Sequence, residues 1–153
     1  MLESEKVVEL LEEERREGAS RDELLRSAVR RIESSEDYYD WVGVYLLDGP
    51  EELVLHSYIG APTEHDRIAV GEGVCGTAVA EETDLNVPDV DEVENYLACS
   101  PETRSEMVVL IRDGDGGTIH GQLDLDSDRK AAFDDRDRRE LKVVADWLAG
   151  LFG

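Results

Sequence analysis

Apolar positions in the first third of the chain repeat with the period of a helix. Between residues 4 and 17 they form one face, and Gly18 ends the segment. Ser20 and Glu23 then have the spacing of a capping box, in which each side chain satisfies a main-chain amide of the other residue. A second apolar run at helical spacing follows. Residues 1–36 are therefore expected to form two amphipathic helices, which either pack on the core or extend outward as a homodimer contact.

From Trp41 onward the apolar positions alternate with a period of two, which indicates strands. After Asp134 the apolar positions again repeat with the period of a helix, and Asp134 is a residue type that commonly caps a helix N-terminus. We expect a single domain over residues 1–153 with its motif-bearing core at 38–153. The order of elements predicts an α+β fold, with a central antiparallel sheet, helices packed on one face and a loop-lined pocket on the other. The expected elements after the first two helices are strands 41–47 and 52–59, an apolar stretch at 67–70, a helix at 77–82, a strand at 85–87, a helical turn within 91–96, and strands 106–112 and 118–126.

The length and composition of the chain fit an ordinary globular protein. It has 153 residues, of which 41% are apolar, and no apolar run approaches the roughly 20 residues that span a bilayer. The acidic N-terminal segment lacks the basic and apolar regions of a signal peptide. We therefore expect a soluble, cytoplasmic protein.

The charge of the chain is strongly negative. Thirty-eight acidic residues against sixteen basic ones give a net charge of −22, and the acids are spread along the whole sequence. Such a field repels the phosphates of nucleic acids and of anionic membranes, so neither is expected as a partner. Uniform acidity also predicts adaptation to high salt, where counterions screen the self-repulsion. It does not indicate what the protein does.

The sequence contains two cysteines, Cys75 and Cys99. A single bridge would add little to a core of this size, so a secreted disulfide scaffold is not expected. Composition alone allows both residues to be small buried hydrophobic groups or reactive thiols. The three histidines, His56, His65 and His120, have no metal-ligand spacing with one another or with the cysteines. Neither a metal nor a bound cofactor is expected.

Several polar and aromatic residues occupy strand positions that suit a pocket. Asp124 and Asp126 lie two apart and therefore share a face, where paired carboxyls tend to hold a common proton. Such a carboxyl could act as a general acid, although a solvated strand face is the alternative. Glu106 opens an otherwise apolar strand, as a pocket residue or at a strand edge. Trp41 and Tyr45 lie four apart on one face, either in the pocket or in the core.

Taken together and in order, six short motifs resemble a GAF domain of the free methionine-(R)-sulfoxide reductase group. The resemblance extends from about residue 38 to the end, and the two cysteines lie 24 residues apart within it. It implies that Trp41 and Tyr45 are aromatic pocket residues. It further implies that Glu106, Asp124 and Asp126 bind the substrate's amino group and help to protonate the sulfoxide oxygen. The motifs are WVGVYLL at 41–47, GVCGTA at 73–78, VPDV at 87–90, LAC at 97–99, SEMVV at 105–109 and LDLDS at 123–127.

The resemblance also assigns the thiols and raises a question about turnover. It implies that Cys99 is the nucleophile that attacks the sulfoxide and that Cys75 is a second family cysteine. The family's usual third cysteine, ten residues before Cys75, is replaced here by His65. Turnover needs another thiol to convert a sulfenic acid into a disulfide that a thioredoxin-like reductant can reduce. Two functions therefore remain: a thiol-dependent reductase of free L-methionine-(R)-sulfoxide, and a GAF small-molecule or redox sensor without turnover.

Overall fold

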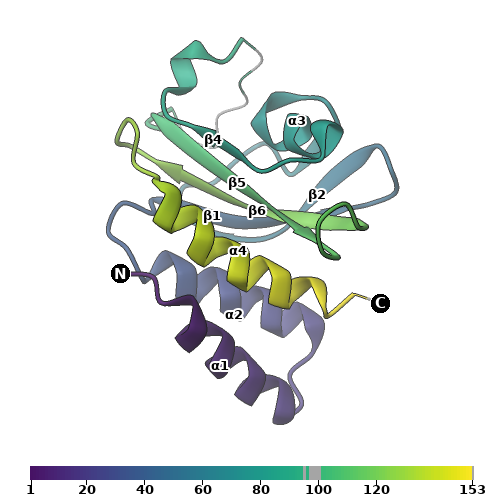
Figure 1. Ribbon diagram of the computed structural model, residues 1–153. Helices are drawn as coiled ribbons and strands as arrows, with labels where there is room; N and C mark the ends of the chain where they lie inside the picture. The colour runs from purple at the N-terminus through teal and green to yellow at the C-terminus, as the bar shows by residue number, and fades with distance from the viewer. Residues whose placement is uncertain (95, 97–100, 153) are drawn as a thin grey trace.

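The computed structural model describes residues 1–94, 96 and 101–152, and its centre is a six-stranded antiparallel sheet in the order β3-β2-β1-β6-β5-β4 (Figure 1). Helices accompany the sheet, which confirms the expected α+β fold. The helices are α1 (Ser4–Arg16), α2 (Arg21–Glu33), α3 (Gly73–Glu81) and α4 (Asp135–Ala149), with a short 3₁₀ helix, η1 (Val90–Glu92). The strands are β1 (Trp41–Leu47), β2 (Glu52–Ile59), β3 (Arg67–Ala69), β4 (Leu85–Val87), β5 (Ser105–Arg112) and β6 (Ile119–Ser127).

Helices α1, α2 and α4 lie on one side of the sheet, and α3 lies on the other (Figure 1). The two N-terminal helices pack on the core, because the buried residues of both belong to the same apolar cluster as the inner face of α4. Trp147 on α4 donates its indole N–H to Glu12 on α1 at 2.6 Å. Of the two arrangements the sequence allowed for these helices, the structure shows packing on the core, and a homodimer contact stays a prediction.

Local capping defines where α2 and α4 begin. Ser20 and Glu23 form the expected capping box, and Asp134 forms another with Asp137 at the start of α4. The hydroxyls of Tyr38 and Tyr39 both donate to Oδ1 of Asp137 at 2.6 Å. These contacts hold the segment before β1 against the first turn of α4, and they therefore fix α4 close to the start of β1.

The short helix α3 begins four residues earlier than the sequence predicted, at Gly73 rather than at residue 77. Three glycines, at positions 71, 73 and 76, indicate a place where the main chain turns sharply or comes close to a neighbour, and the structure shows both. Gly73 starts the helix with a φ of +61°, a conformation that favours glycine. A Cβ on Gly76 would collide with the main-chain oxygen of Ala69, so its absence lets α3 approach the end of β3 closely. The earlier start places Cys75 inside the first turn of α3.

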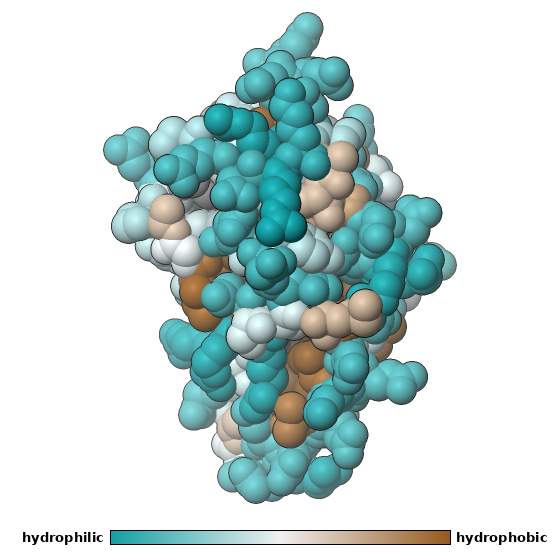
Figure 2. Space-filling model, turned by 90° about the vertical axis from the view of Figure 1, so that its left-hand side faces the viewer, coloured by the Kyte–Doolittle hydropathy of each residue, from teal (hydrophilic) through white to brown (hydrophobic). Residues whose placement is uncertain are grey.

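The face of the molecule drawn in Figure 2 is predominantly hydrophilic. Figure 2 shows polar side chains over most of the face it displays, with apolar residues in small separate patches. No helix in the described part of the chain is long and apolar enough to cross a membrane.

Candidate functional site

Alternation along β5 and β6 separates apolar from polar side chains. Leu123 and Leu125 belong to the cluster under α1, α2 and α4, whereas Asp124 and Asp126 are buried on the face that carries α3. The expectation that the two aspartates share one face is confirmed. Glu106 on β5 lies opposite Asp126 on β6, so strand pairing brings a third buried carboxyl beside them.

Cys75 is positioned against this row of carboxyls by α3. Its Sγ lies 3.7 Å from Oε2 of Glu106, to which the thiol donates. Gln122 on β6 donates its side-chain N–H to the main-chain oxygen of Cys75 at 3.3 Å, which fixes the first turn of α3 over the sheet. The thiol sulfur, one carboxylate oxygen of Glu106 and one of Asp124 lie within 4.8 Å of one another. Three separate elements, α3, β5 and β6, thus converge on one point.

The electrostatics of this point favour protonated carboxyls. Burial raises the pKa of Glu106 well above its ordinary value, and the nearby carboxylates of Asp124 and Asp126 raise it further. Burial also raises the pKa of Asp124. Glu106 therefore keeps its proton to a higher pH than an exposed glutamate does, which makes it suited to donate a proton inside the site.

Two aromatic side chains of β1, Trp41 and Tyr45, are buried on the same side of the sheet as Cys75. Trp41 on β1 lies opposite Asp126, stacks on Tyr58 with ring centroids 5.3 Å apart, and donates its indole N–H to Ala61 O at 3.0 Å. Gly43 leaves room for the Trp41 ring in this position, because a Cβ on residue 43 would lie 2.5 Å from that ring. Tyr45 is fully buried, and its hydroxyl donates to the main-chain oxygen of His65 at 2.7 Å. Tyr45 therefore anchors the loop that follows β2.

A cavity of about 130 Å³ opens beside Trp41 and Asp126. Pockets that hold drug-sized ligands have volumes of roughly 300–1,000 Å³, so this smaller cavity suits a ligand that is smaller than a typical drug. Four of its lining residues are acidic and none of them is basic. This balance favours a ligand that carries a positive group such as an ammonium. The lining residues are Asp40, Trp41, Ala61, Glu102, Thr103, Asp126, Ser127 and Asp128.

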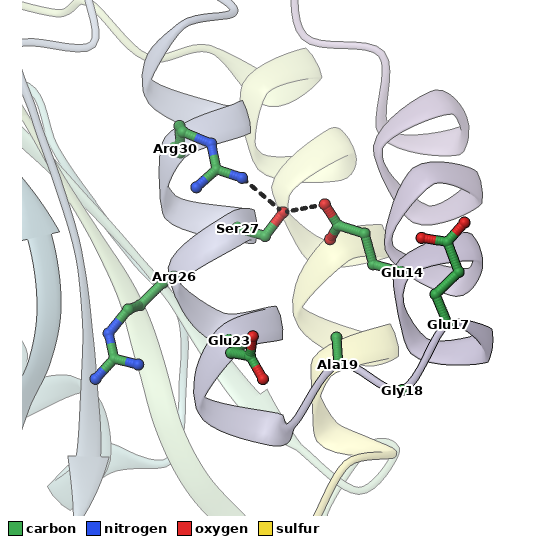
Figure 3. Close-up of a pocket in the computed structure, with 8 residues that line it drawn as sticks. All are labelled: Glu14, Glu17, Gly18, Ala19, Glu23, Arg26, Ser27 and Arg30. Carbon is green, nitrogen blue, oxygen red and sulfur yellow. Dashed lines mark hydrogen bonds between the residues drawn. The ribbon is translucent and has the colours of Figure 1, made fainter.

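A larger hollow, of about 480 Å³, lies between α1 and α2 (Figure 3). One of its charged side chains, Glu14, belongs to a surface network: Ser27 donates to Glu14 at 3.0 Å, and Arg31 forms an ion pair with the same carboxylate at 2.9 Å. Burial acts to raise the pKa of Glu14, but the hydrogen bonds from Arg31 and Ser27 bring it below its ordinary value. The network holds α1 against α2. None of the residues that line this hollow is a cysteine, so it lacks a thiol such as that of Cys75.

The structure brings together most of the residues that the sequence singled out. Cys75, Glu106 and Asp124 form the central cluster, and Asp126, which lies opposite Glu106 in the sheet, lines the cavity together with Trp41. Tyr45 lies on the same face of the sheet, with its hydroxyl directed to the loop. The predicted nucleophile, Cys99, falls outside the described residues. The catalytic and binding roles assigned to these side chains stay predictions.

Three residues of the site were missed by the sequence interpretation. Gln122 is fully buried and continues the row of Asp124 and Asp126, which its place two residues before Asp124 could have indicated. Asp40 accepts a hydrogen bond from the main-chain N–H of Asp128 at 2.8 Å at the rim of the cavity, and burial raises its pKa. Gly43 could have been noticed as a glycine inside a strand, a common sign of close approach.

Comparison with known proteins defines the class of this fold and site. The GAF domain family matches residues 20–151, and the chain belongs to that family. It is 45% identical over 104 residues to GAF domain-containing protein A of Dictyostelium discoideum, covering 68% of this chain and 64% of that protein. It is 37% identical over 108 residues to the free methionine-R-sulfoxide reductase of Saccharomyces cerevisiae, covering 69% of this chain and 59% of that protein. The matched region is thus less than two thirds of the length of either relative.

A solved structure extends the likeness to the whole fold. The free methionine-R-sulfoxide reductase of Neisseria meningitidis, in complex with its substrate, superposes with a TM-score of 0.85 at 33% identity. The match covers 97% of this chain and 87% of that one. The chain is therefore similar, in sequence and in fold, to enzymes that reduce a small sulfoxide.

Proposed function

We propose that this protein reduces free L-methionine-(R)-sulfoxide to methionine with a cysteine thiol as the electron source. The observation that carries the proposal is the convergence of Cys75, Glu106 and Asp124 within 4.8 Å, beside a small acidic cavity. The likeness to reductases of this substrate supports it.

The cavity chemistry suits an amino acid substrate. The ammonium group of methionine sulfoxide carries the positive charge that the acidic lining favours, and Asp126 is buried where Trp41 and the cavity meet. The ring of Trp41 offers an apolar surface for the side chain. Glu106, whose pKa burial raises, holds the proton that the sulfoxide oxygen needs.

The proposed reaction has three balanced steps. The Cys99 sulfur attacks the substrate sulfur, Glu106 gives its proton to the sulfoxide oxygen, and the thiol proton of Cys99 replaces the one that Glu106 gave. The oxygen then passes to the Cys99 sulfur as a hydroxyl while the sulfur–oxygen bond of the substrate and the transient sulfur–sulfur bond break, so that methionine leaves and Cys99 becomes a sulfenic acid. The substrate sulfur is reduced by two electrons and Cys99 is oxidised by two. Cys75 then attacks the Cys99 sulfur, forming a disulfide and releasing water. A thioredoxin-like dithiol finally reduces this disulfide by exchange. No bound cofactor enters the scheme, which needs a reducing compartment such as the cytoplasm.

The test is multiple turnover of the (R)-sulfoxide by purified protein in molar salt, with a thioredoxin system or with dithiothreitol. Wild type should turn over with both reductants. Cys99→Ser should reduce no substrate. Cys75→Ser should complete one turnover per chain with thioredoxin, because its sulfenic acid cannot form the internal disulfide, and dithiothreitol should restore part of the rate. Undiminished activity of Cys99→Ser would refute the assignment of the nucleophile.

A sensor without turnover is the second candidate, and the replacement of the family's third cysteine by His65 favours it. A folded protein that binds the (R)-sulfoxide in calorimetry but reduces none of it, even with dithiothreitol, would establish the sensor. Sedimentation equilibrium of the same preparation would test the predicted homodimer.

A further inference from the structure

Cys75, Glu106 and Asp124 have the arrangement of ligands around a single metal ion. Their sulfur and oxygen atoms lie within 4.8 Å of one another, and each side chain is at most 4% exposed. The β5–β6 ladder places Asp124 opposite Val108, two residues beyond Glu106, so pairing of the two strands fixes both carboxyls. The first turn of α3 supplies the sulfur from above the sheet.

The distance between the Cys75 sulfur and the Glu106 oxygen matches tetrahedral coordination. Zinc–sulfur and zinc–oxygen bonds of about 2.3 and 2.1 Å place two such ligands about 3.6 Å apart at a tetrahedral angle. The Sγ of Cys75 and Oε2 of Glu106 are 3.7 Å apart. One thiolate with two carboxylates suits Zn²⁺ or Co²⁺ better than Mg²⁺ or Ca²⁺, which take oxygen ligands in larger shells.

A second observation beside the cluster also indicates a ligand. Gln122 is 0% exposed, and its Oε1 has no hydrogen-bond partner among the described residues. The other end of the same amide contacts the main chain of Cys75. A buried amide oxygen is a good acceptor for water held on a metal and can itself ligate one. In the described part of the chain, no basic residue lines the adjacent cavity to balance the carboxyls.

We propose that Cys75, Glu106 and Asp124 form a zinc site and that zinc bound there blocks the candidate active site. On binding, the thiol and any protonated carboxyl release their protons to solvent, and the three groups become ligands. Binding itself does not depend on the reductase, whereas the block rests on the proposed function. The ligands come from three distant segments, which is why no metal-ligand spacing appears along the chain.

The experiment is a titration of the reduced 153-residue chain with Co²⁺ in high salt, which limits loose binding to the acidic surface. A cobalt–thiolate bond gives a charge-transfer band in the near ultraviolet, whereas cobalt held only by carboxylates gives none. We expect the band to saturate at one equivalent and to disappear when one equivalent of Zn²⁺ is added. Asp124→Asn should weaken Co²⁺ binding by about tenfold or more.

Two thiol variants and a matched surface variant control the assignment. Cys75→Ser should abolish the band, while Cys99→Ser and the exposed Asp115→Asn should keep it. Absence of the band from wild type, or its loss in Cys99→Ser with retention in Cys75→Ser, would overturn the site. Circular dichroism of each variant confirms that it is folded.

Inhibition is measured separately, with thioredoxin as the reductant because small dithiols bind zinc. We expect Zn²⁺ to raise the apparent KM for the sulfoxide, and a chelator to restore it. A protein that reduces the sulfoxide but shows no cobalt band would refute the zinc site alone. A protein that shows the band but lacks turnover without metal would refute the reductase alone.

Discussion

The two faces of the central sheet are made by the same strands but are stabilised in different ways. Toward α1, α2 and α4, β5 and β6 present apolar residues such as Met107 and Leu125, which pack in one apolar cluster. Toward α3, the alternate positions present Glu106 and Asp124, whose carboxyls are buried together at a cost in free energy. We therefore expect the face covered by α1, α2 and α4 to contribute most of the stability, whereas the opposite face holds the candidate site. Substitutions on the first face should change mainly stability, and substitutions on the second should change mainly activity.

The largest expected effect is on the stability of the helix-covered face. Leu125 is fully buried between Val42 and Met107, its neighbours in the sheet. Leu125→Ala should lower the free energy of unfolding by about 2–5 kcal/mol, measured by urea denaturation. Val143→Ala on the 42% exposed Val143 of α4 should change it by less than about 0.5 kcal/mol. Equal stability of the two variants would contradict this division of roles.

The next effect should appear on the pocket face as a loss of activity without a loss of stability. Glu106→Gln removes the proposed proton donor, so turnover should fall by about 100-fold or more. Its unfolding free energy should stay level or rise, because one of three crowded carboxyls is gone. Parallel kinetics and denaturation on this variant and on the exposed Glu9→Gln would measure both quantities. Near-normal turnover in Glu106→Gln would remove the glutamate from the mechanism.

A smaller effect is expected in the pH dependence of stability. Because the pKa of Glu106 is raised in the folded state, the native protein holds a proton that the unfolded chain releases above about pH 4.3. This contribution is fully present below that pH and is lost as the pH rises through the raised pKa. Wild type should therefore lose more stability than Glu106→Gln over that range. Self-repulsion of the acidic surface is common to both proteins. Identical profiles of unfolding free energy against pH would therefore show that the pKa of Glu106 is not raised in the folded state.

The smallest effect returns to the helix-covered face. Ser20→Ala removes the side-chain cap of α2 and should lower the unfolding free energy by about 1 kcal/mol. Ser20→Asp, which keeps a capping oxygen, should restore it. Activity should be unaffected in both variants, and a loss of turnover in either would show that α2 is coupled to the pocket.

Local patterns in the sequence predicted much of the sheet. Strands 41–47 and 52–59 were predicted at the bounds observed for β1 and β2, because alternation and a turn define a hairpin locally. The start of α3 was wrong by four residues, because the role of Gly76 depends on the main chain of Ala69, which sequence patterns do not place beside it. The short helix α3 also lies on the side of the sheet that carries the candidate site, whereas the longer helices α1, α2 and α4 share the opposite side.

The candidate site was predictable in its members but not in its geometry. Alternation was enough to place Asp124 and Asp126 on one face. The approach of Cys75 to Glu106 depends on α3 folding back over β5, a contact between residues 31 positions apart. Gln122 was missed because a glutamine in a strand has many explanations until its contact with Cys75 is seen. Nothing tests the expected adaptation to high salt, which stays a prediction from composition.

The two tryptophans provide an optical reporter for each face. Trp147 lies between α4 and α1 with its indole N–H on Glu12, while Trp41 lies beside Asp126 at the cavity. Indole emission responds to nearby charge and to water. In a Trp147→Phe protein the remaining fluorescence therefore reports occupancy of the cavity alone, and in a Trp41→Phe protein it reports the integrity of the helix layer. Ligand binding and unfolding can thus be followed separately, with no added dye.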